Sequence, residues 1–429
     1  MEAIAVIAEF NPFHTGHAYL LSEIRRQRPS DAAIIVLMSG AFVQRGEPAL
    51  FDKWHRAAWA VGSGADAVFE LPAVYALSSA AGFAAGGVRL ASRLSCNSLA
   101  CGVETGTAND FLRLAKTALS LSSGESIKTA TAGRNQTEDL AKALPELASL
   151  LEQPNALLAL EYAKAILHLP SPLSLLTIPR TGSHAETGFD QLYPVASAPP
   201  GTGKRLFAQI RSLSASASRG DIEALLKTGA CTDYGRYGDF VSLQGRLMTP
   251  ERLRRLPAFT EGLENRWHRA FSTLPTYDEA LFSVKTKRYA FSRLCRMGAY
   301  TVLQPSQDFF DKSYREGPQY GRILAFNERG AAFLKEIKGS FPIITKAAQD
   351  KKILSPLGQA QLDLDIRPMT FRPSVFAALP AEKGTATITR RRAISPRRIA
   401  KGNIDLFLSI YLFYSPKSAI ISTVFFIFP

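Results

Sequence analysis

The chain has 429 residues, of which 46% are hydrophobic and 21% charged, a composition typical of a globular protein with room for two or three domains. No signal peptide precedes the first apolar segment, and the cysteines show no paired framework. Both features favour the reducing cytoplasm over a disulfide-stapled secreted protein. The four cysteines are expected to be buried or incidental thiols: Cys96, Cys101, Cys231 and Cys295.

Charge is unevenly distributed along the chain. Residues 1–200 carry 15 Lys and Arg against 18 Asp and Glu, a net charge of −3. Residues 201–429 carry 36 against 19, a net charge of +17. A nearly neutral half joined to a strongly basic half indicates that the basic half meets a polyanion, for which RNA is the natural candidate. The alternative is a solvated basic surface with no partner.

The first predicted elements are a strand over residues 3–7 and an apolar-periodic helix, joined by Asn-Pro-Phe-His-Thr-Gly-His at residues 11–17. A strand that turns into a helix places free backbone N–H groups and the positive helix end together, which suits a phosphate. His14 and His17 can both face that anion, and Gly16 lets the chain approach it closely. The His-x-Gly-His pattern is shared by nucleotidylyltransferases and class I aminoacyl-tRNA synthetases, so chemistry at the α-phosphate of ATP is the leading hypothesis.

A metal site, or two ordinary surface residues, is the alternative interpretation of this histidine pair. The chain has six His and four Cys, and no third ligand lies at a spacing typical of zinc sites. We therefore expect no protein-bound metal at these histidines.

The next residues alternate between strand-like and helix-like patterns. Strands are predicted over residues 32–38, 67–71 and 98–102, and helices over 52–62 and 74–92. Such alternation is typical of the α/β class with a parallel, doubly wound sheet. Ligands of these sheets lie at the carboxyl ends of the strands, so the histidine motif and Gly102 are expected to share one site.

A glycine-containing loop over residues 39–48 carries Gln44 and Arg45, and Lys53 and Arg56 follow on the predicted helix. A cation here could neutralise the β- and γ-phosphates of ATP and stabilise departing pyrophosphate. The alternative is a solvated loop followed by a pair of exposed basic residues.

Two further polar residues lie at predicted element ends in the first half. Asn155 is a plausible N-cap of a helix over residues 156–167. A strand over residues 174–182 carries Arg180 near its carboxyl end, where an arginine would contact phosphate or ribose.

Residues 250–300 interleave basic and aromatic side chains, a pattern that suits phosphate contacts combined with base stacking. Residues 278–297 also show helical periodicity, so the same aromatic residues fit a packed core. The basic residues are Arg252, Arg254, Arg255, Arg266, Lys285, Lys287, Arg288, Arg293 and Arg296, and the aromatic ones are Trp267, Tyr289 and Phe291.

The chain resembles the bacterial tRNA(Met) cytidine acetate ligase family over residues 1 to about 365. The matching stretches occur in the same order as in that family: 9–17, 39–48, 52–54, 64–72, 154–155, the strand end at Arg180, 214–219, 261–266 and 284–289. The turn after Arg180 and everything from about residue 365 depart from the family pattern.

The resemblance implies a Rossmann-like nucleotidyltransferase domain with a parallel sheet, followed by a mainly helical basic RNA-binding region. It implies that acetate and ATP form acetyl-adenylate, and that the acetyl group passes to N4 of the wobble cytidine of elongator tRNA(Met). Mg²⁺ is expected with the ATP. The implied ATP site comprises Ile7, Ala8, Glu9, Phe10, Asn11, Pro12, Phe13, His14, Thr15, Gly16, His17, Ala18, Tyr19, Leu20, Gly102, Asn155, Arg180 and Thr181, with His14 and His17 catalytic.

The expected division is an ATP and acetate domain over residues 1–200 and a tRNA-binding region over 201–365. Residues 366–429 are expected to be a divergent, disordered basic and apolar tail, whose apolar pieces are shorter than a membrane span needs. Within the tRNA-binding region, we expect Lys285, Lys287 and Arg288 to contact the RNA. Two alternatives remain: a small-molecule adenylyltransferase, and an RNA-binding protein that keeps a nucleotide fold without catalysis.

Overall fold

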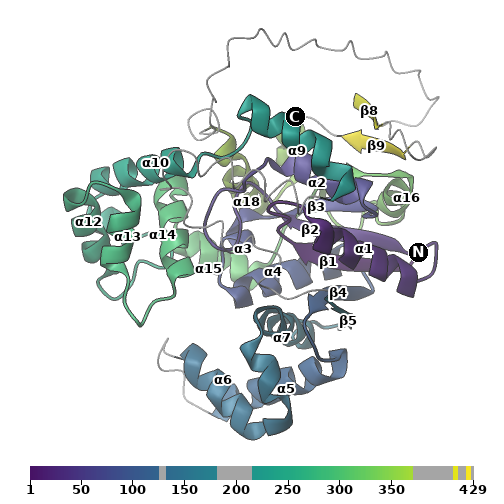
Figure 1. Ribbon diagram of the computed structural model, residues 1–429, viewed down its shortest axis with the longest axis horizontal. Helices are drawn as coiled ribbons and strands as arrows, with labels where there is room; N and C mark the ends of the chain where they lie inside the picture. The colour runs from purple at the N-terminus through teal and green to yellow at the C-terminus, as the bar shows by residue number, and fades with distance from the viewer. Residues whose placement is uncertain (125–131, 181–214, 371–408, 414–421, 427–429) are drawn as a thin grey trace.

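The computed structural model describes residues 1–124, 132–180, 215–370, 409–413 and 422–426 (Figure 1). The expected domain boundary at residue 200 and the expected ATP ligand Thr181 lie outside these residues. Most of the expected tail does as well.

A parallel sheet forms the centre of the molecule. Its strands lie in the order β5-β4-β1-β2-β3 and are all parallel to their neighbours, as predicted. Their register is defined by pairs such as Ala5 with Ile35, Val36 with Val68, and Val6 with Ala100. The strands are β1 (Ala3–Ala8), β2 (Ala33–Ser39), β3 (Ala67–Leu71), β4 (Ser98–Val103) and β5 (Ser174–Pro179).

The strand order places a topological switch between β1 and β4. From β1 the chain passes outward through β2 and β3, and then returns to the other side of β1 for β4 and β5. Crossovers that leave in opposite directions open a crevice at the carboxyl ends of the two central strands. The histidine motif follows β1, and Gly102 lies near the end of β4, so the fold brings both to this crevice.

The basic half contributes strands to the same sheet. Strand β6 (Gly321–Phe326) pairs antiparallel with β3, and β7 (Ile343–Ile344) pairs parallel with β6. The expected region over 201–365 is therefore helical in its first part but returns to the sheet. Two strands of the tail, β8 (Ser409–Phe413) and β9 (Ser422–Phe426), continue the sheet beyond β6.

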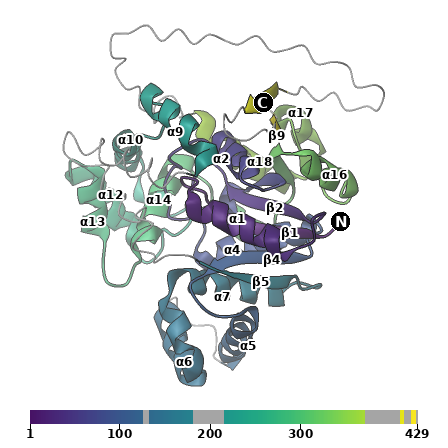
Figure 2. The ribbon, with the colours of Figure 1, turned by 45° about the vertical axis from the view of Figure 1, so that its right-hand side comes forward.

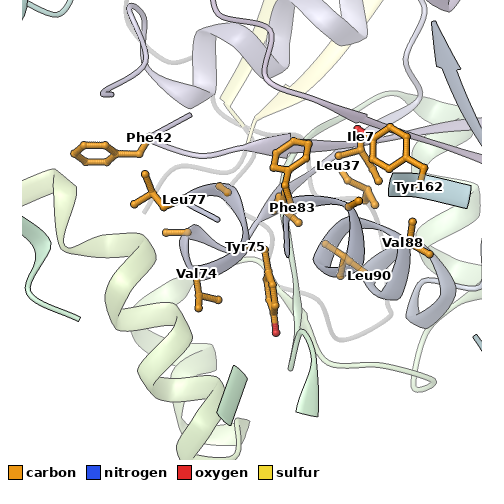
Figure 3. Close-up of a cluster of buried hydrophobic side chains, with 14 of the residues drawn as sticks. Ile7, Leu37, Phe42, Val74, Tyr75, Leu77, Phe83, Val88, Leu90 and Tyr162 are labelled. Carbon is orange, nitrogen blue, oxygen red and sulfur yellow. The ribbon is translucent and has the colours of Figure 1, made fainter. Parts of the chain in front are cut away.

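The alternation of side chains along β1 produces one core on each face of the sheet. Ile4 and Val6 pack with residues of α1 (Thr15–Gln27) and α2 (Lys53–Gly62). Ala3, Ala5 and Ile7 face the opposite core, where Phe83, Val88 and Leu90 of α4 (Ala80–Arg93) lie together with Leu37 (Figure 3). Burial on both faces explains why the central strands are almost continuously apolar.

Helix α4 approaches β1 very closely. A Cβ placed on Gly87 would lie 2.5 Å from Cδ1 of Ile7. Glycine at position 87 is therefore required by packing. The single helix predicted over residues 74–92 is instead α3 (Ala73–Ala76) followed by α4, because the Ser79 side chain caps a new helix by accepting a hydrogen bond from the Gly82 amide.

Two groups of helices flank the sheet (Figures 1 and 2). One group, beside β5, consists of α5 (Ala108–Gly124), α6 (Ala132–Ala143), η1 (Pro145–Glu152) and α7 (Pro154–Leu167). The other comes from the basic half and contains α10 (Tyr234–Leu247), α11 (Pro250–Leu253), α12 (Leu263–Thr273), α13 (Tyr277–Val284), α14 (Phe291–Leu303) and α15 (Gln307–Glu316). Helix α9 (Ser216–Thr228) packs against α2. The remaining helices are α16 (Glu328–Glu336), α17 (Ala347–Asp350), η3 (Lys351–Ile353) and α18 (Pro356–Ile366).

The helical pattern predicted over residues 278–297 is interrupted in the structure. Lys285 has an extended backbone that ends α13, and α14 begins only at Phe291. Between them the chain turns so that Tyr289 is buried and donates a hydrogen bond from its hydroxyl to Oε2 of Glu261, 3.0 Å away. This tertiary contact overrides the local periodicity.

Candidate nucleotide-binding site

A cavity of about 680 Å³ lies at the topological switch of the sheet. Its size is within the range of small-molecule and cofactor sites. Of the predicted ATP ligands, it is lined by Ile7, Ala8, Glu9, Phe10, His14, Gly16, His17, Tyr19, Leu20, Gly102, Asn155 and Arg180. The structure thus brings residues from four separate parts of the first half to one place.

The two histidines cap helix α1 reciprocally. Nδ1 of His14 accepts a hydrogen bond from the Gly16 amide at 3.1 Å, and Nδ1 of His17 accepts one from the His14 amide at 3.2 Å. This is a capping box in which imidazoles replace the usual hydroxyl and carboxylate. A Cβ on Gly16 would lie 3.0 Å from Cε1 of His14, so any side chain at this position would crowd the imidazole ring.

These contacts determine where each neutral imidazole carries its proton. A backbone N–H can only donate, so both Nδ1 atoms act as acceptors and the ring hydrogen lies on Nε2. Burial, followed by the charge of Arg180, lowers the pKa of His14 to about 4. Burial, followed by the charges of His14 and Arg180, lowers the pKa of His17 as well. At neutral pH each histidine is therefore a neutral Nε2–H donor on the wall of the cavity.

The expectation of free backbone N–H groups at this turn is wrong for two amides. Those of His14 and Gly16 already donate to the imidazoles, because the rings fold back over the helix end. The helix end still has its positive dipole. The hydrogen-bond donors that this turn offers to an anion are chiefly the histidine side chains.

Arg180, the residue that follows β5, lies next to Gly102 of the neighbouring strand β4. The Arg180 amide donates to the Val103 carbonyl at 2.9 Å, which continues the pairing of β5 with β4. The protein atom nearest to a Cβ placed on Gly102 would be Cγ of Arg180, at 3.5 Å. Packing within the protein therefore does not require glycine here, and its lack of a side chain instead leaves room in the cavity.

Asn155 lines the cavity but does not cap its helix, contrary to the prediction. Helix α7 has Gln153 at its N-cap, so Asn155 is the second residue of the helix and lies in its first turn. Oε1 of Glu104 accepts hydrogen bonds from Nδ2 of Asn155 at 2.6 Å and from its amide at 3.4 Å. The carboxylate that follows β4 thus fixes the orientation of the Asn155 amide.

Lys53 and Arg56 are neither phosphate ligands nor an exposed pair, so both interpretations of them are wrong. Nζ of Lys53 lies 2.5 and 2.7 Å from the carboxylate oxygens of Glu70, which also binds Arg322. Arg56 is completely buried and donates to the carbonyls of Glu9, Ser39, Gly40 and Phe51. Arg56 therefore ties together the loops that follow β1 and β2, and both loops contribute residues to the cavity lining.

Five residues of the predicted ATP segment do not line the cavity. Phe13 is buried in the core below the motif, and Oδ1 of Asn11 accepts a hydrogen bond from the Leu50 amide at 2.7 Å. A consecutive segment cannot present every side chain to one ligand, since a turn and a helix direct them all around the backbone. The five are Asn11, Pro12, Phe13, Thr15 and Ala18.

The cavity also has lining residues that are absent from the predicted ATP site. Gln44 and Arg45 line it from the loop after β2, which the sequence analysis considers as a source of a cation for the β- and γ-phosphates. Phe83 and Tyr162 come from the apolar faces of α4 and α7, and no sequence signal separates them from ordinary core residues. Ser292 comes from α14 in the basic half, which the predicted division assigned to RNA binding.

Two of the three aromatic residues considered for base stacking belong to the core, in line with the alternative interpretation. Trp267 is completely buried and Tyr289 is 7% exposed, so neither can stack on a base and this part of the prediction is wrong. Lys287 and Arg288 are exposed in the turn between α13 and α14, while Lys285 is partly buried and donates to the Thr286 carbonyl at 2.6 Å. Arg288 also forms an ion pair with Glu261 at 2.8 Å.

Metal binding, membrane crossing and the state of the cysteines can each be assessed for the described residues. No group of three or more His, Cys, Asp and Glu side chains within them could hold a metal ion. None of the helices among them has the length and apolar character needed to cross a membrane. All four cysteines are buried thiols, as expected.

A parallel sheet with a cavity at its switch point, and paired histidines at the first helix, defines a nucleotidyltransferase-type site. In agreement, a model of the HIGH nucleotidyl transferase family matches residues 1–384. The tRNA(Met) cytidine acetate ligase of Leuconostoc citreum is 34% identical over 386 residues, covering 86% of this chain and 91% of that protein. The enzyme of that name from Oenococcus oeni is 36% identical over 358 residues, covering 82% and 91%.

A crystal structure of Thermotoga maritima TmcAL bound with alpha-thio ATP has the same fold. It superimposes with a TM-score of 0.78 and 28% sequence identity, and the match covers 88% of this chain and 96% of that one. The chain therefore belongs to the tRNA(Met) cytidine acetate ligase family, a group of HIGH nucleotidyl transferases. The resemblance found in the sequence is confirmed.

Proposed function

We propose that this protein is an ATP-dependent ligase that activates acetate as acetyl-adenylate and transfers the acetyl group to N4 of the wobble cytidine of elongator tRNA(Met). The observation that carries this proposal is the pair of neutral Nε2–H donors at the switch-point cavity, beside Arg180. The names of the relatives support the choice of acetate and tRNA(Met). The structure of the Thermotoga relative with an ATP analogue supports the choice of nucleotide.

In the first step an acetate oxygen attacks the α-phosphorus of ATP. A P–O bond to acetate forms while the bond to the β-phosphate breaks, and pyrophosphate leaves. Negative charge grows on the phosphoryl oxygens, where His14 and His17 would donate hydrogen bonds from Nε2. Arg45 and Arg180 line the same cavity and would bind the triphosphate. Removing one such preorganised donor typically costs about 3 to 4 kcal/mol of transition-state stabilisation.

The described donor set does not fit a metal bound by the protein alone. Mg²⁺ usually keeps several water ligands and is held largely through substrate phosphates. We therefore place any Mg²⁺ on the triphosphate, where it would neutralise charge.

In the second step the cytosine amine attacks the carbonyl carbon of acetyl-adenylate. A C–N bond forms, the bond to AMP breaks, and the amine loses a proton. This step mainly requires that the amine be held against the anhydride. We assign the ATP and acetate chemistry to residues 1–200 and contacts with tRNA to the region 201–365, whose Ser292 lies on the cavity wall. We propose that the reaction takes place in the cytoplasm.

A small-molecule adenylyltransferase is the competing function, because the first half alone would serve it equally well. That alternative leaves the net charge of +17 on residues 201–429 without a purpose. It also gives no reason for a residue of the basic half to line the cavity.

Pyrophosphate release from ATP, measured with and without acetate and elongator tRNA(Met), tests the proposal when combined with nucleoside analysis of the tRNA. We expect acetate-dependent turnover that yields N4-acetylcytidine. Pyrophosphate release that is independent of acetate but requires a phosphorylated small molecule would support the adenylyltransferase instead.

A further inference from the structure

We propose that Phe282 and Phe291 form a platform on which an unpaired RNA base stacks beside the cavity. This inference deepens the proposed function and rests on it for the identity of the RNA. The two residues lie on either side of the basic turn over residues 285–290, at the end of α13 and the start of α14.

The two rings are exposed and lie against each other. Phe282 is 67% exposed and Phe291 37%, and their centroids are 5.7 Å apart with planes inclined by 30°. Single exposed apolar residues are common on proteins, but an adjacent pair of aromatic rings forms a patch. The neighbouring aromatics Trp267 and Tyr289 are buried, so Phe282 and Phe291 are the rings in this part of the helical group that offer a face to solvent.

The pair is fixed close to the cavity. Ser292, the residue after Phe291, lines the cavity together with His14. One helical turn further on, Nη1 of Arg296 donates to the Gln44 carbonyl at 3.1 Å, which ties α14 to the loop after β2. A Cβ on Gly46 would lie 2.2 Å from the Arg296 amide, so that loop packs directly on α14. A base on the platform would therefore lie near the proposed acetyl-adenylate.

Charge around the pair favours a nucleic acid over an apolar protein segment. Lys287 and Arg288 are exposed in the intervening turn. Arg266 is exposed as well, and its Nη2 donates to the Ser283 carbonyl at 3.2 Å, next to Phe282. Proteins that bind single-stranded nucleic acid combine aromatic rings that stack on bases with cations that contact the backbone. This turn presents both within a few residues.

The test is binding of the labelled anticodon stem-loop of elongator tRNA(Met) to the full chain, measured by fluorescence anisotropy. Phe282→Ala and Phe291→Ala should each weaken binding by between about 5- and about 100-fold, the range for loss of one stacked base. Phe282→Trp should retain affinity, while Phe282→Leu, which keeps apolar area but no ring, should lose it. Leu247→Ala is the matched control, because Leu247 is 65% exposed on α10 and should not affect binding.

Different outcomes would overturn different parts of the argument. If the wild-type chain forms N4-acetylcytidine but both alanine variants bind RNA normally, the platform is wrong and the proposed function stands. If the wild-type chain binds the stem-loop through both rings yet acetylates nothing, the platform stands and the function falls. If Phe282→Leu binds normally while Phe282→Ala changes the sedimentation of the free protein, the patch is a contact between two copies of the chain.

Discussion

The imidazole rings of His14 and His17 lie stacked, with centroids 3.6 Å apart and planes inclined by 28°. Two cations could not share this arrangement without strong repulsion, and the lowered pKa of each ring agrees with a neutral pair. The site therefore offers an anion two neutral hydrogen-bond donors whose tautomers are fixed by backbone amides. This arrangement leads to the first two predictions.

His14→Asn should strongly impair adenylate formation while the protein remains folded. Asparagine is a good N-cap and can still accept from the Gly16 amide, but it has no group at the position of Nε2. We expect acetate-dependent ATP–pyrophosphate exchange to fall by roughly 100- to 1,000-fold, as is typical when one transition-state donor is lost. His17→Ala should behave similarly. Ser22→Ala, an exposed change later in α1, serves as the control, and unchanged exchange in the histidine variants would exclude this role.

The histidine pair should also make the protein less stable in acid. The pKa of His14 is about 4 in the folded chain and 6.5 in its ordinary state, so the unfolded chain takes up the proton first as the pH falls. The contribution of neutral His14 to the free energy of unfolding should therefore be present above about pH 6.5 and be lost as the pH falls toward 4. Proton uptake by His14 in the unfolded chain should alone lower the free energy of unfolding by about 2 kcal/mol between pH 7 and pH 5.

Urea unfolding of the wild-type chain and of His14→Asn at both pH values measures this effect. The difference between the two proteins cancels the contributions of other groups, such as Asp365, whose pKa burial raises to about 7. Equal pH dependence in the two proteins would contradict the lowered pKa of His14.

Much of the nucleotide-binding half could be predicted from sequence because its signals are local. Buried parallel strands are continuous apolar runs, as in Ala33–Ser39, and a strand followed by a glycine-containing turn and a helix predicts an anion site. The strand over Ala67–Leu71 agrees with the prediction at both ends. Parallel topology then places Gly102 and Arg180 beside the motif without any further information.

The predictions that failed depended on long-range partners. Lys53 follows a polar loop and looks like a phosphate ligand, but its partner Glu70 is 17 residues away in an apolar strand. Trp267 and Tyr289 look like stacking residues because their neighbours are basic, yet packing turns both inward. A side chain's direction in such segments is set by tertiary contacts that short-range periodicity does not contain.

The buried ion pair of Lys53 and Glu70 leads to a third prediction, on stability. The Glu70 carboxylate also accepts from Nη1 of Arg322 at 3.1 Å, and the side chains of Lys53 and Glu70 are each 2% exposed. Glu70→Gln would leave two buried cations without their counter-charge, so we expect a loss of about 3 to 5 kcal/mol in the free energy of unfolding. Glu23→Gln breaks the exposed pair with Arg26 and should have little effect. Similar urea midpoints for the two variants would show that the buried pair is not structural.

The last prediction concerns the charge of the basic turn. Neutralising Lys285, Lys287 and Arg288 together, each to glutamine, should weaken tRNA binding most at low salt, because phosphate contacts release condensed counterions. The slope of log affinity against log salt concentration should become shallower by about 2 to 3, since each of the three lost contacts contributes between about 0.7 and about 0.9. The ion pair of Arg288 with Glu261 does not oppose this, because it is exposed and a phosphate can replace the carboxylate.

Glutamine substitutions of Lys335 and Lys338 provide the matched control for that measurement. Both lysines are exposed, and Lys335 lies on α16, on the opposite side of the molecule from α13 and α14 (Figure 1). If the charge of the chain acted only through its total, the control would lower affinity in proportion to the two charges removed. If the RNA phosphates contact the basic turn itself, the control should leave the salt slope unchanged while the triple variant reduces it. Equal slopes for the triple variant and the wild-type chain would place the RNA on another surface.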